Sequence, residues 1–192
     1  MDEKILCDLF NSAGFDGKEL SSRLIFKFGS LAAALEADEN ILCEACDSKS
    51  AATYLKLAAA LAARRVSDRL RFGKQNSEEE ILCYFKAIFF ALSVETVYVM
   101  SLDRLGRPIS CEKAGEGTVN GTNVLPRRIV EIAKRAGACS VVLAHNHPSG
   151  YAVASDDDIV GSIVLRELLY AAGIKLIAHY VIAGADSVKI DI

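Results

Sequence analysis

An uninterrupted apolar run that ends in histidine limits the folds this chain can adopt. Residues 139–145 (CSVVLAH) have the length of a β-strand and include no charged side chain. A run of this kind predicts a strand buried on both faces, in the middle of a sheet. His145 and His147 at its end are two residues apart, so on extended backbone they project to the same side. We therefore expect both imidazoles to be able to reach one ion.

The elements expected before this strand divide the chain into two parts. Residues 1 to about 72 carry apolar residues at helical spacing throughout, including an Ala- and Leu-rich stretch over 50–71. A polar turn over 72–77 follows. Ser77 and Glu80 then form a capping box, which starts a new helix at about residue 78. We predict a helical domain over 1–77 and a second domain over 78–192.

The second domain alternates helices and strands. The expected helices cover 78–92, 126–135 and 155–172, and the expected strands cover 95–102, 109 onward, 139–145, 174–182 and 188–192. This alternation predicts a layered α/β (α+β) domain.

Composition excludes several classes of protein. Hydrophobic residues make up 52% and charged residues 24%, which is typical of a folded globular protein and not of a disordered one. The net charge of −3 gives the molecule no excess of positive charge for nucleic acid. Residues 1–4 lack a signal-peptide pattern, and the most apolar window, 81–100, contains Lys86 and Glu95. We expect a soluble, cytoplasmic protein with no membrane contact.

The six cysteines are scattered among apolar neighbours, which is typical of buried thiols in a reducing compartment. Cys43 and Cys46 have the spacing of half a zinc knuckle or a redox pair. No second cysteine or histidine pair follows at a usable distance, so the ligand count for such a site is incomplete.

Residues near the end of the apolar run have the chemistry of a metal site. His145, His147 and Asp158 offer two imidazoles and a carboxylate, which suit Zn²⁺ and leave a fourth tetrahedral position for water. Ser155 and Asp158 also have the spacing of a helix-capping box, which is a commoner feature than a metal site. Because the chain has only three histidines, two of them beside this carboxylate favour the metal site.

These residues resemble a known family. H-x-H-P, a spacer and S-x-x-D resemble the motif of JAMM/MPN+ metalloproteases, and the string HNHPSG over 145–150 is similar to their RadC branch. Further matches over about 80–185 are Ser101-Leu-Asp103, Gly117-Thr118 and Pro126-Arg127. The resemblance implies a mixed sheet flanked by helices, preceded by a small all-helical domain that is similar to a helix-hairpin-helix.

The resemblance also implies a catalytic glutamate on the first strand after a helix. Glu95 opens such a strand, and Glu112 and Glu116 on the next strand are the alternatives. In the implied chemistry Zn²⁺ activates a water, Glu95 acts as general acid–base, and Ser155 donates a hydrogen bond to the oxyanion. The bond cleaved would be an amide, a peptide or an isopeptide.

Two departures from the family bear on function. Ala178-His179 stands where these sequences usually carry Asp-His, and we interpret His179 as a strand histidine or a residue beside the site, not as a ligand. Residues 43–50 lack the glycine pair of a DNA-binding hairpin, and acidic and basic residues balance over 1–77, eleven of each. A basic cluster at 64–74 keeps an alternative open, a non-enzymatic DNA repair or recombination accessory protein with a structural metal.

Overall fold

The computed structural model of the protein describes residues 1–90, 92–116 and 124–192, and it comprises two compact units, Met1–Arg64 and Arg65–Ile192. The division falls inside a long helix, α5 (Lys49–Ser67). The domain boundary expected at residue 77 comes later in the chain and stays a prediction.

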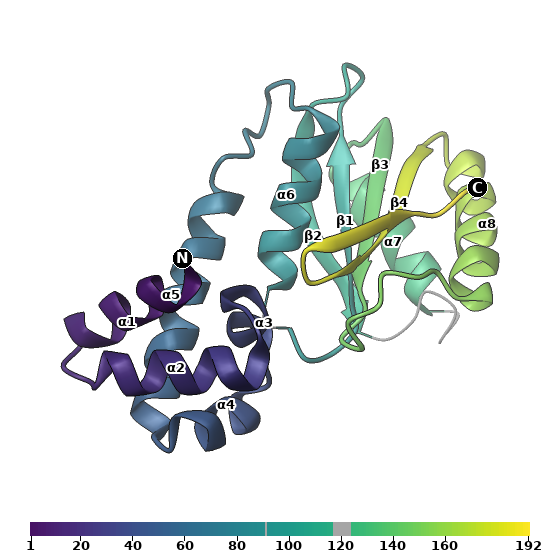
Figure 1. Ribbon diagram of the computed structural model, residues 1–192. Coiled ribbons are helices and arrows are strands. Elements are labelled where there is room, and N and C mark those ends of the chain that lie inside the picture. Colours follow the sequence, from purple (N-terminus) through teal and green to yellow (C-terminus); the bar gives the residue numbers. More distant parts are fainter. Residues whose placement is uncertain (91, 117–123) are drawn as a thin grey trace. The chain divides into compact units, whose positions relative to one another are not determined.

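The first unit is entirely helical in its described residues, as its apolar spacing predicted. Its other helices are α1 (Asp2–Ser12), α2 (Gly17–Phe28), α3 (Leu31–Glu36) and α4 (Glu39–Cys46) (Figure 1). Their shared core consists mainly of leucine, alanine and phenylalanine, including the fully buried Leu6, Phe10, Leu24, Leu42 and Leu55. Burial of these side chains is the main force that holds the short helices together, because isolated helices of this length are marginal in water.

Two backbone positions set the geometry of this unit. A Cβ on Gly17 would lie 2.2 Å from the Cys7 carbonyl oxygen, so α1 and α2 approach closely only because residue 17 is glycine. Residues 43–50, where a DNA-binding hairpin would carry glycines, include the end of α4 and the start of α5. The two helices are joined through Asp47, which is in the left-handed conformation (φ 48°). Asp47 therefore adopts a conformation that favours glycine, and it places a carboxylate in the turn.

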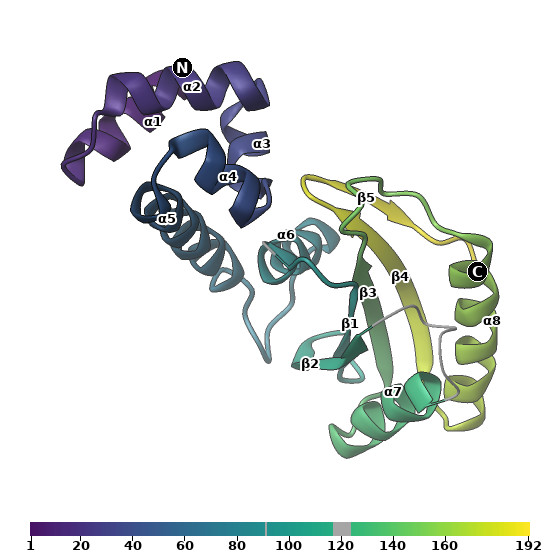
Figure 2. The ribbon, with the colours of Figure 1, turned by 90° about the horizontal axis from the view of Figure 1, so that it is seen from below.

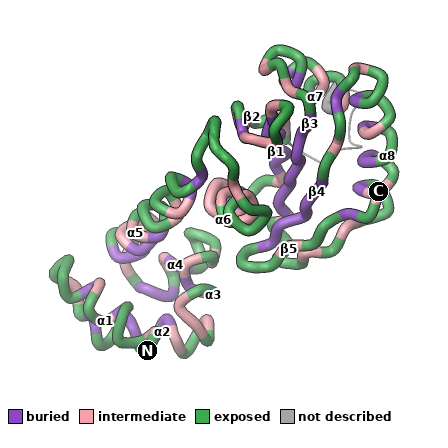
Figure 3. Tube along the Cα trace, turned by 90° about the horizontal axis from the view of Figure 1, so that it is seen from above, coloured by how far each residue is buried: buried purple, intermediate pink, exposed green. Residues whose placement is uncertain are grey.

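The second unit has a five-stranded mixed sheet. Its elements are α6 (Glu78–Phe89), β1 (Thr96–Leu102), β2 (Pro108–Glu116), α7 (Val124–Arg135), β3 (Ser140–Asn146), α8 (Asp156–Ala171), β4 (Lys175–Ala183) and β5 (Asp186–Lys189). The strand order is β2-β1-β3-β4-β5, with β3 parallel to β4 and the other neighbours antiparallel. Every residue of β3 is buried, which confirms the predicted central strand (Figure 3).

Helices cover both faces of this sheet (Figure 2). Val141 and Leu143 of β3 face α7 and α8, whereas Val142 and Ala144 face α6. The alternation of side chains along a strand explains this division. The predicted α/β (α+β) fold, a mixed sheet flanked by helices after a small helical region, is confirmed.

Three elements of the second unit differ from the sequence-based prediction by two residues or more at an end. Helix α6 ends at Phe89 instead of 92, because Phe90 is extended (ψ 127°), and α7 starts at Val124 instead of 126. The last strand pairs over Asp186–Lys189 instead of 188–192, because Gly184 (φ 56°) turns the chain early and Ala183 already faces Asp186. The family match at Gly117-Thr118 lies outside the described residues.

Among the described residues, no helix combines the length and apolarity that crossing a bilayer requires. All six cysteines are free thiols, and burial, together with the neighbouring Cys43, raises the pKa of Cys46. The raised pKa of Cys46 disfavours the thiolate that metal binding or thiol exchange would need at this residue.

Candidate metal centre

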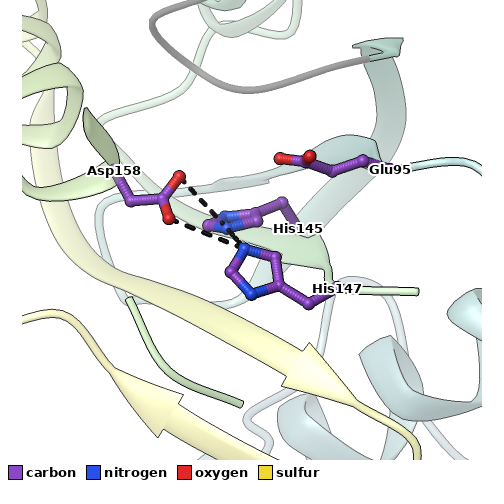
Figure 4. A group of neighbouring side chains, drawn as sticks. All are labelled: Glu95, His145, His147 and Asp158. Carbon is purple, nitrogen blue, oxygen red and sulfur yellow. Dashed lines mark hydrogen bonds and ion pairs between the residues drawn. The ribbon is translucent and has the colours of Figure 1, made fainter. Parts of the chain in front are cut away.

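Strand β3, the residues just before β1 and just after β3, and helix α8 bring four potential metal ligands together. The side chains of Glu95, His145, His147 and Asp158 point toward one another (Figure 4), and one ligand atom from each lies within 4.8 Å of all the others. The three predicted zinc ligands and the predicted general acid–base therefore lie at one place. Their individual roles stay predictions.

The backbone of β3 explains how the two histidines converge. His145 lies on the same face of β3 as Val141 and Leu143, and His147 follows two residues later. Their Nε2 atoms are 3.0 Å apart. The N–H of His147 donates to the Ile182 carbonyl oxygen at 2.8 Å, which holds the end of β3 against β4 beyond its last paired residue.

Asp158 caps α8 and also faces the histidines. Its Oδ2 accepts hydrogen bonds from the Ser155 N–H at 2.9 Å and the Ser155 hydroxyl at 2.6 Å, which completes the predicted capping box. Its Oδ1 lies 3.4 Å from His145 Nε2. Its Oδ2 lies 3.6 Å from His147 Nε2. The cap and the metal site are compatible, because the hydrogen bonds of the cap use only Oδ2 and leave Oδ1 for an ion.

The surroundings of Asp158 keep it ionised. Burial by itself would raise the pKa of Asp158, but the His145 imidazole and the hydroxyl and N–H of Ser155 outweigh burial and hold that pKa well below its usual range. The side chain is 1% exposed. A buried carboxylate that stays charged needs a cationic partner.

Asn146 holds Glu95 beside the histidines. In the antiparallel register Val97 faces His145, so the residue two positions before Val97 lies next to His147. The Asn146 side chain accepts from the Thr96 N–H at 2.8 Å and donates to the carbonyl oxygens of Leu92 and Val94 at 3.4 and 3.3 Å. These three hydrogen bonds fix the segment that carries Glu95 to the residue between the two histidines.

The alternative glutamates have other partners. Glu112 forms an ion pair with Arg135 at 2.6 Å, and Glu116 forms one with Lys113 at 2.6 Å. Neither carboxylate is in the group around His145.

The donor atoms fit a metal ion. Among the described residues, Asp158 Oδ1 and Glu95 Oε1 are buried without a hydrogen-bond partner, and unsatisfied buried acceptors are costly unless a cation or water fills the space between them. His147 Nδ1 lies 3.2 Å from the Tyr151 carbonyl oxygen. Since a carbonyl can only accept, the proton is on Nδ1, and His147 Nε2 has a free lone pair.

The third histidine lies behind His145. His179 Nε2 is 2.9 Å from His145 Nδ1, and His179 Nδ1 is 2.6 Å from the Ser162 hydroxyl. Burial, with a smaller contribution from His145, lowers the pKa of His179 to about 3. His179 is therefore a neutral, satisfied strand histidine outside the ligand group.

Two residues of the centre were missed at the sequence level. Asn146 lies within the His-x-His motif itself. Ser162 occupies the inner face of α8 with Leu165 and Leu169, so a polar residue at an apolar position was the available signal.

Comparison with known proteins decides the family. Residues 75–189 match the family described as the RadC-like JAB domain. The chain belongs to this family. The four clustered side chains of Figure 4 thus lie in the part of the protein that the RadC-like JAB domain covers.

Several bacterial relatives match nearly the whole chain. A UPF0758 protein of Chromobacterium violaceum is 34% identical over 177 residues, which cover 91% of this chain and 79% of the relative. A UPF0758 protein of Vibrio campbellii is 34% identical over 182 residues (92% and 80%), and one of Nitrosococcus oceani is 32% identical over 190 residues (96% and 84%). The similarity therefore extends beyond the RadC-like JAB domain into the helical unit.

Proposed function

We propose that this RadC-like protein is a zinc-dependent metallohydrolase that cleaves an amide, peptide or isopeptide bond. The observation that carries the proposal is the pair of histidine Nε2 atoms, 3.0 Å apart, facing a buried carboxylate oxygen that accepts no hydrogen bond from the described part of the chain. Membership in the RadC-like JAB family supports it, since the wider JAB superfamily includes hydrolases.

Three side chains would hold the ion. His145, His147 and Asp158 offer two imidazoles and a carboxylate, the donor set of many catalytic zinc sites. A bound Zn²⁺ supplies Lewis acidity and, through its effect on the pKa of water, a nucleophile at neutral pH. A purely structural site would need no second carboxylate beside the three ligands, so the position of Glu95 favours catalysis.

Glu95 is the group that would move the proton. Its carboxylate lies with the ligand atoms, and its Oε1 is buried without a hydrogen-bond partner among the described residues. It would accept a proton from the attacking water and deliver it to the leaving amine. General acid–base catalysis of this kind is typically worth about 10²–10⁴-fold in rate.

Ser155 would stabilise the oxyanion of the tetrahedral intermediate. Its hydroxyl donates to Asp158 Oδ2 in this structure, at the N-terminus of α8. The residue is exposed, so its hydroxyl can turn toward a substrate while the Ser155 N–H keeps its own hydrogen bond to Asp158. One such donor is typically worth about 3 kcal/mol in the transition state.

Elemental analysis tests the metal. Full-length wild type purified without chelator should carry about one zinc per chain, and His147→Ala should carry much less. Glu95→Gln should keep the wild-type amount, because its amide replaces a group that is not one of the three ligands. Equal zinc in wild type and His147→Ala, or iron in place of zinc, would contradict the proposal.

Hydrolysis is tested with a mixed peptide pool in ¹⁸O-labelled water. Cleavage places one ¹⁸O in each new carboxyl terminus, which mass spectrometry detects. Wild type should produce labelled termini, and Glu95→Gln should lose this activity by at least about 100-fold while it stays zinc-loaded. Equal activity of the two proteins would show that Glu95 is not the general acid–base.

The DNA accessory function is the second proposal, and its support is the basic cluster Arg64, Arg65, Arg69, Arg71 and Lys74. Asp47 in the α4–α5 turn opposes it, since a carboxylate at that turn repels phosphate. Full-length protein and duplex DNA decide between the two. Micromolar binding with a steep salt dependence would favour the accessory function.

A further inference from the structure

Two of the three histidines, His145 and His179, belong to one buried series of hydrogen bonds. The series starts at the backbone carbonyl of Asp158, which lies 2.5 Å from the Ser162 hydroxyl. It continues from Ser162 to His179 Nδ1 at 2.6 Å, and from His179 Nε2 to His145 Nδ1 at 2.9 Å. His145 Nε2, at its far end, faces His147 and Asp158 (Figure 4).

The fold brings these groups together from three elements. His145 on β3 pairs with Val181 on β4, so His179 is its diagonal neighbour on the same face of the sheet. Ser162 reaches that face from α8, one helical turn after Asp158. Ser162, His179 and His145 are each 0% exposed, so solvent water does not compete for their protons.

The carbonyl at the start of the series determines the direction of every hydrogen bond. A carbonyl oxygen can only accept, so the single hydroxyl proton of Ser162 goes to Asp158. Ser162 must then accept from His179, which places the proton of this imidazole on Nδ1. His179 Nε2 has no proton, so it accepts from His145 Nδ1–H.

We propose that His179 and Ser162 are positioning residues that hold His145 as its Nδ1–H tautomer and thereby direct the lone pair of His145 Nε2 to the ligand group. The inference deepens the proposed function and rests on it for the identity of the ion. The tautomers themselves depend only on the protein. Partners of this kind typically change metal affinity by about 10–100-fold when they are removed.

The opposite direction is excluded by the geometry. If His179 accepted from Ser162, no proton would remain between the Ser162 and Asp158 oxygens, which are 2.5 Å apart. His147 has the same Nδ1–H tautomer for a different reason, because its Nδ1–H donates to the Tyr151 carbonyl oxygen. Both Nε2 lone pairs are then directed into the same space.

The alanine at position 178, where related sequences usually carry aspartate, does not affect this arrangement. Ala178 packs against the core under α6, on the opposite face of β4 from His179. The group that orients His179 is therefore Ser162 on α8, and a carboxylate at 178 would point away from the ligands.

Nitrogen NMR of the metal-free protein tests the tautomers. Full-length protein labelled with ¹⁵N in histidine gives only three imidazoles, which the spectra of His147→Ala and His179→Gln assign. We expect His145 and His179 both to carry the proton on Nδ1 above pH 7. A proton on Nε2 of either residue in the wild type would overturn the proposal.

Zinc affinity, measured by competition with a chromogenic chelator, tests the consequence. His179→Leu keeps about the same volume without polar atoms and should weaken zinc binding about 10–100-fold. His179→Gln offers both an acceptor and a donor and should restore much of the affinity. Ser162→Ala should weaken binding, whereas Ser101→Ala, a buried serine at the other end of β1, should leave the affinity unchanged.

Failure of this inference differs from failure of the proposed function. Wild-type affinity in folded His179→Leu and Ser162→Ala would overturn the positioning role and leave the zinc hydrolase standing. Absence of zinc binding by the wild type would overturn the hydrolase, while the NMR result would still decide the tautomers. Thermal unfolding of each variant shows whether it is folded.

Discussion

Asp158→Asn separates the two roles of one carboxylate, and we expect it to remove zinc-dependent stability while leaving most of the helix cap. Asp158 Oδ2 accepts from the Ser155 N–H, and Oδ1 faces His145. An asparagine side chain keeps one acceptor for the cap but has no charge for a cation. Because most of the cap remains, the zinc-free variant should lose less than about 1 kcal/mol, the typical contribution of a whole cap.

The zinc-dependent loss should be larger. A ligand that binds only the folded state adds RT ln(1 + [L]/Kd) to the free energy of unfolding, about 2.7 kcal/mol when free zinc is 100 times Kd. If the substitution weakens binding about 100-fold, the same zinc concentration adds only about 0.4 kcal/mol. At about 4 °C per kcal/mol for a unit of this size, the zinc-induced rise in Tm should fall from about 10 °C to about 2 °C.

Calorimetry of chelator-treated protein, with and without zinc, measures both quantities. The matched control is Asp157→Asn, which removes an exposed carboxylate from the same first turn of α8 and lies outside the ligand group. Zinc bound by unfolded cysteines lowers the rise in Tm of all the proteins alike. Equal zinc-induced rises in the two variants would refute the assignment of Asp158 as a ligand.

Three further predictions concern the contacts of Asn146, His179 and Gly17. Asn146→Ala removes three hydrogen bonds to the segment that carries Glu95. It should lower the rate of hydrolysis about 10²-fold while the zinc content stays unchanged. A variant defective in zinc binding would lose both zinc and activity. In the folded, zinc-free protein the pKa of His179 is about 3, whereas in the unfolded chain His179 protonates near pH 6.5. The free energy of unfolding is therefore fully present above pH 6.5 and falls by up to about 1.4 kcal/mol per pH unit below it. The low pKa of Asp158 adds a further loss of stability below about pH 4. In urea unfolding, His179→Leu should show a smaller dependence of stability on pH between pH 6.5 and 4. An unchanged dependence would contradict the buried neutral imidazole. Gly17→Ala places a methyl group against the Cys7 carbonyl and should destabilise the helical unit by about 1–3 kcal/mol in urea unfolding. If the variant were as stable as the wild type, α1 and α2 would be able to move apart at no cost.

Local pattern was enough for most of the elements and for part of the site. The capping box at Ser77 and Glu80 and the buried strand β3 depend on residues close in sequence, and both are present. The end of the last strand was misplaced, because the early turn at Gly184 and the pairing with β4 together set where β5 begins and ends. Neither can be derived from periodicity alone.

The sequence by itself determined that His145 and His147 project to the same side where a buried strand ends and that Ser155 and Asp158 open a helix, because both features arise from backbone repeats within a few residues. The family resemblance pointed to Asp158 and Glu95, but only the tertiary structure brings these two carboxylates and the third histidine to His145 and His147. The register of β1 on β3 brings Glu95 to His147, the parallel pairing of β3 with β4 brings His179 to His145, and α8 lies over that face with Asp158 and Ser162. Strand register and helix placement come from packing between distant segments, so the spacing of residues along the chain does not contain them.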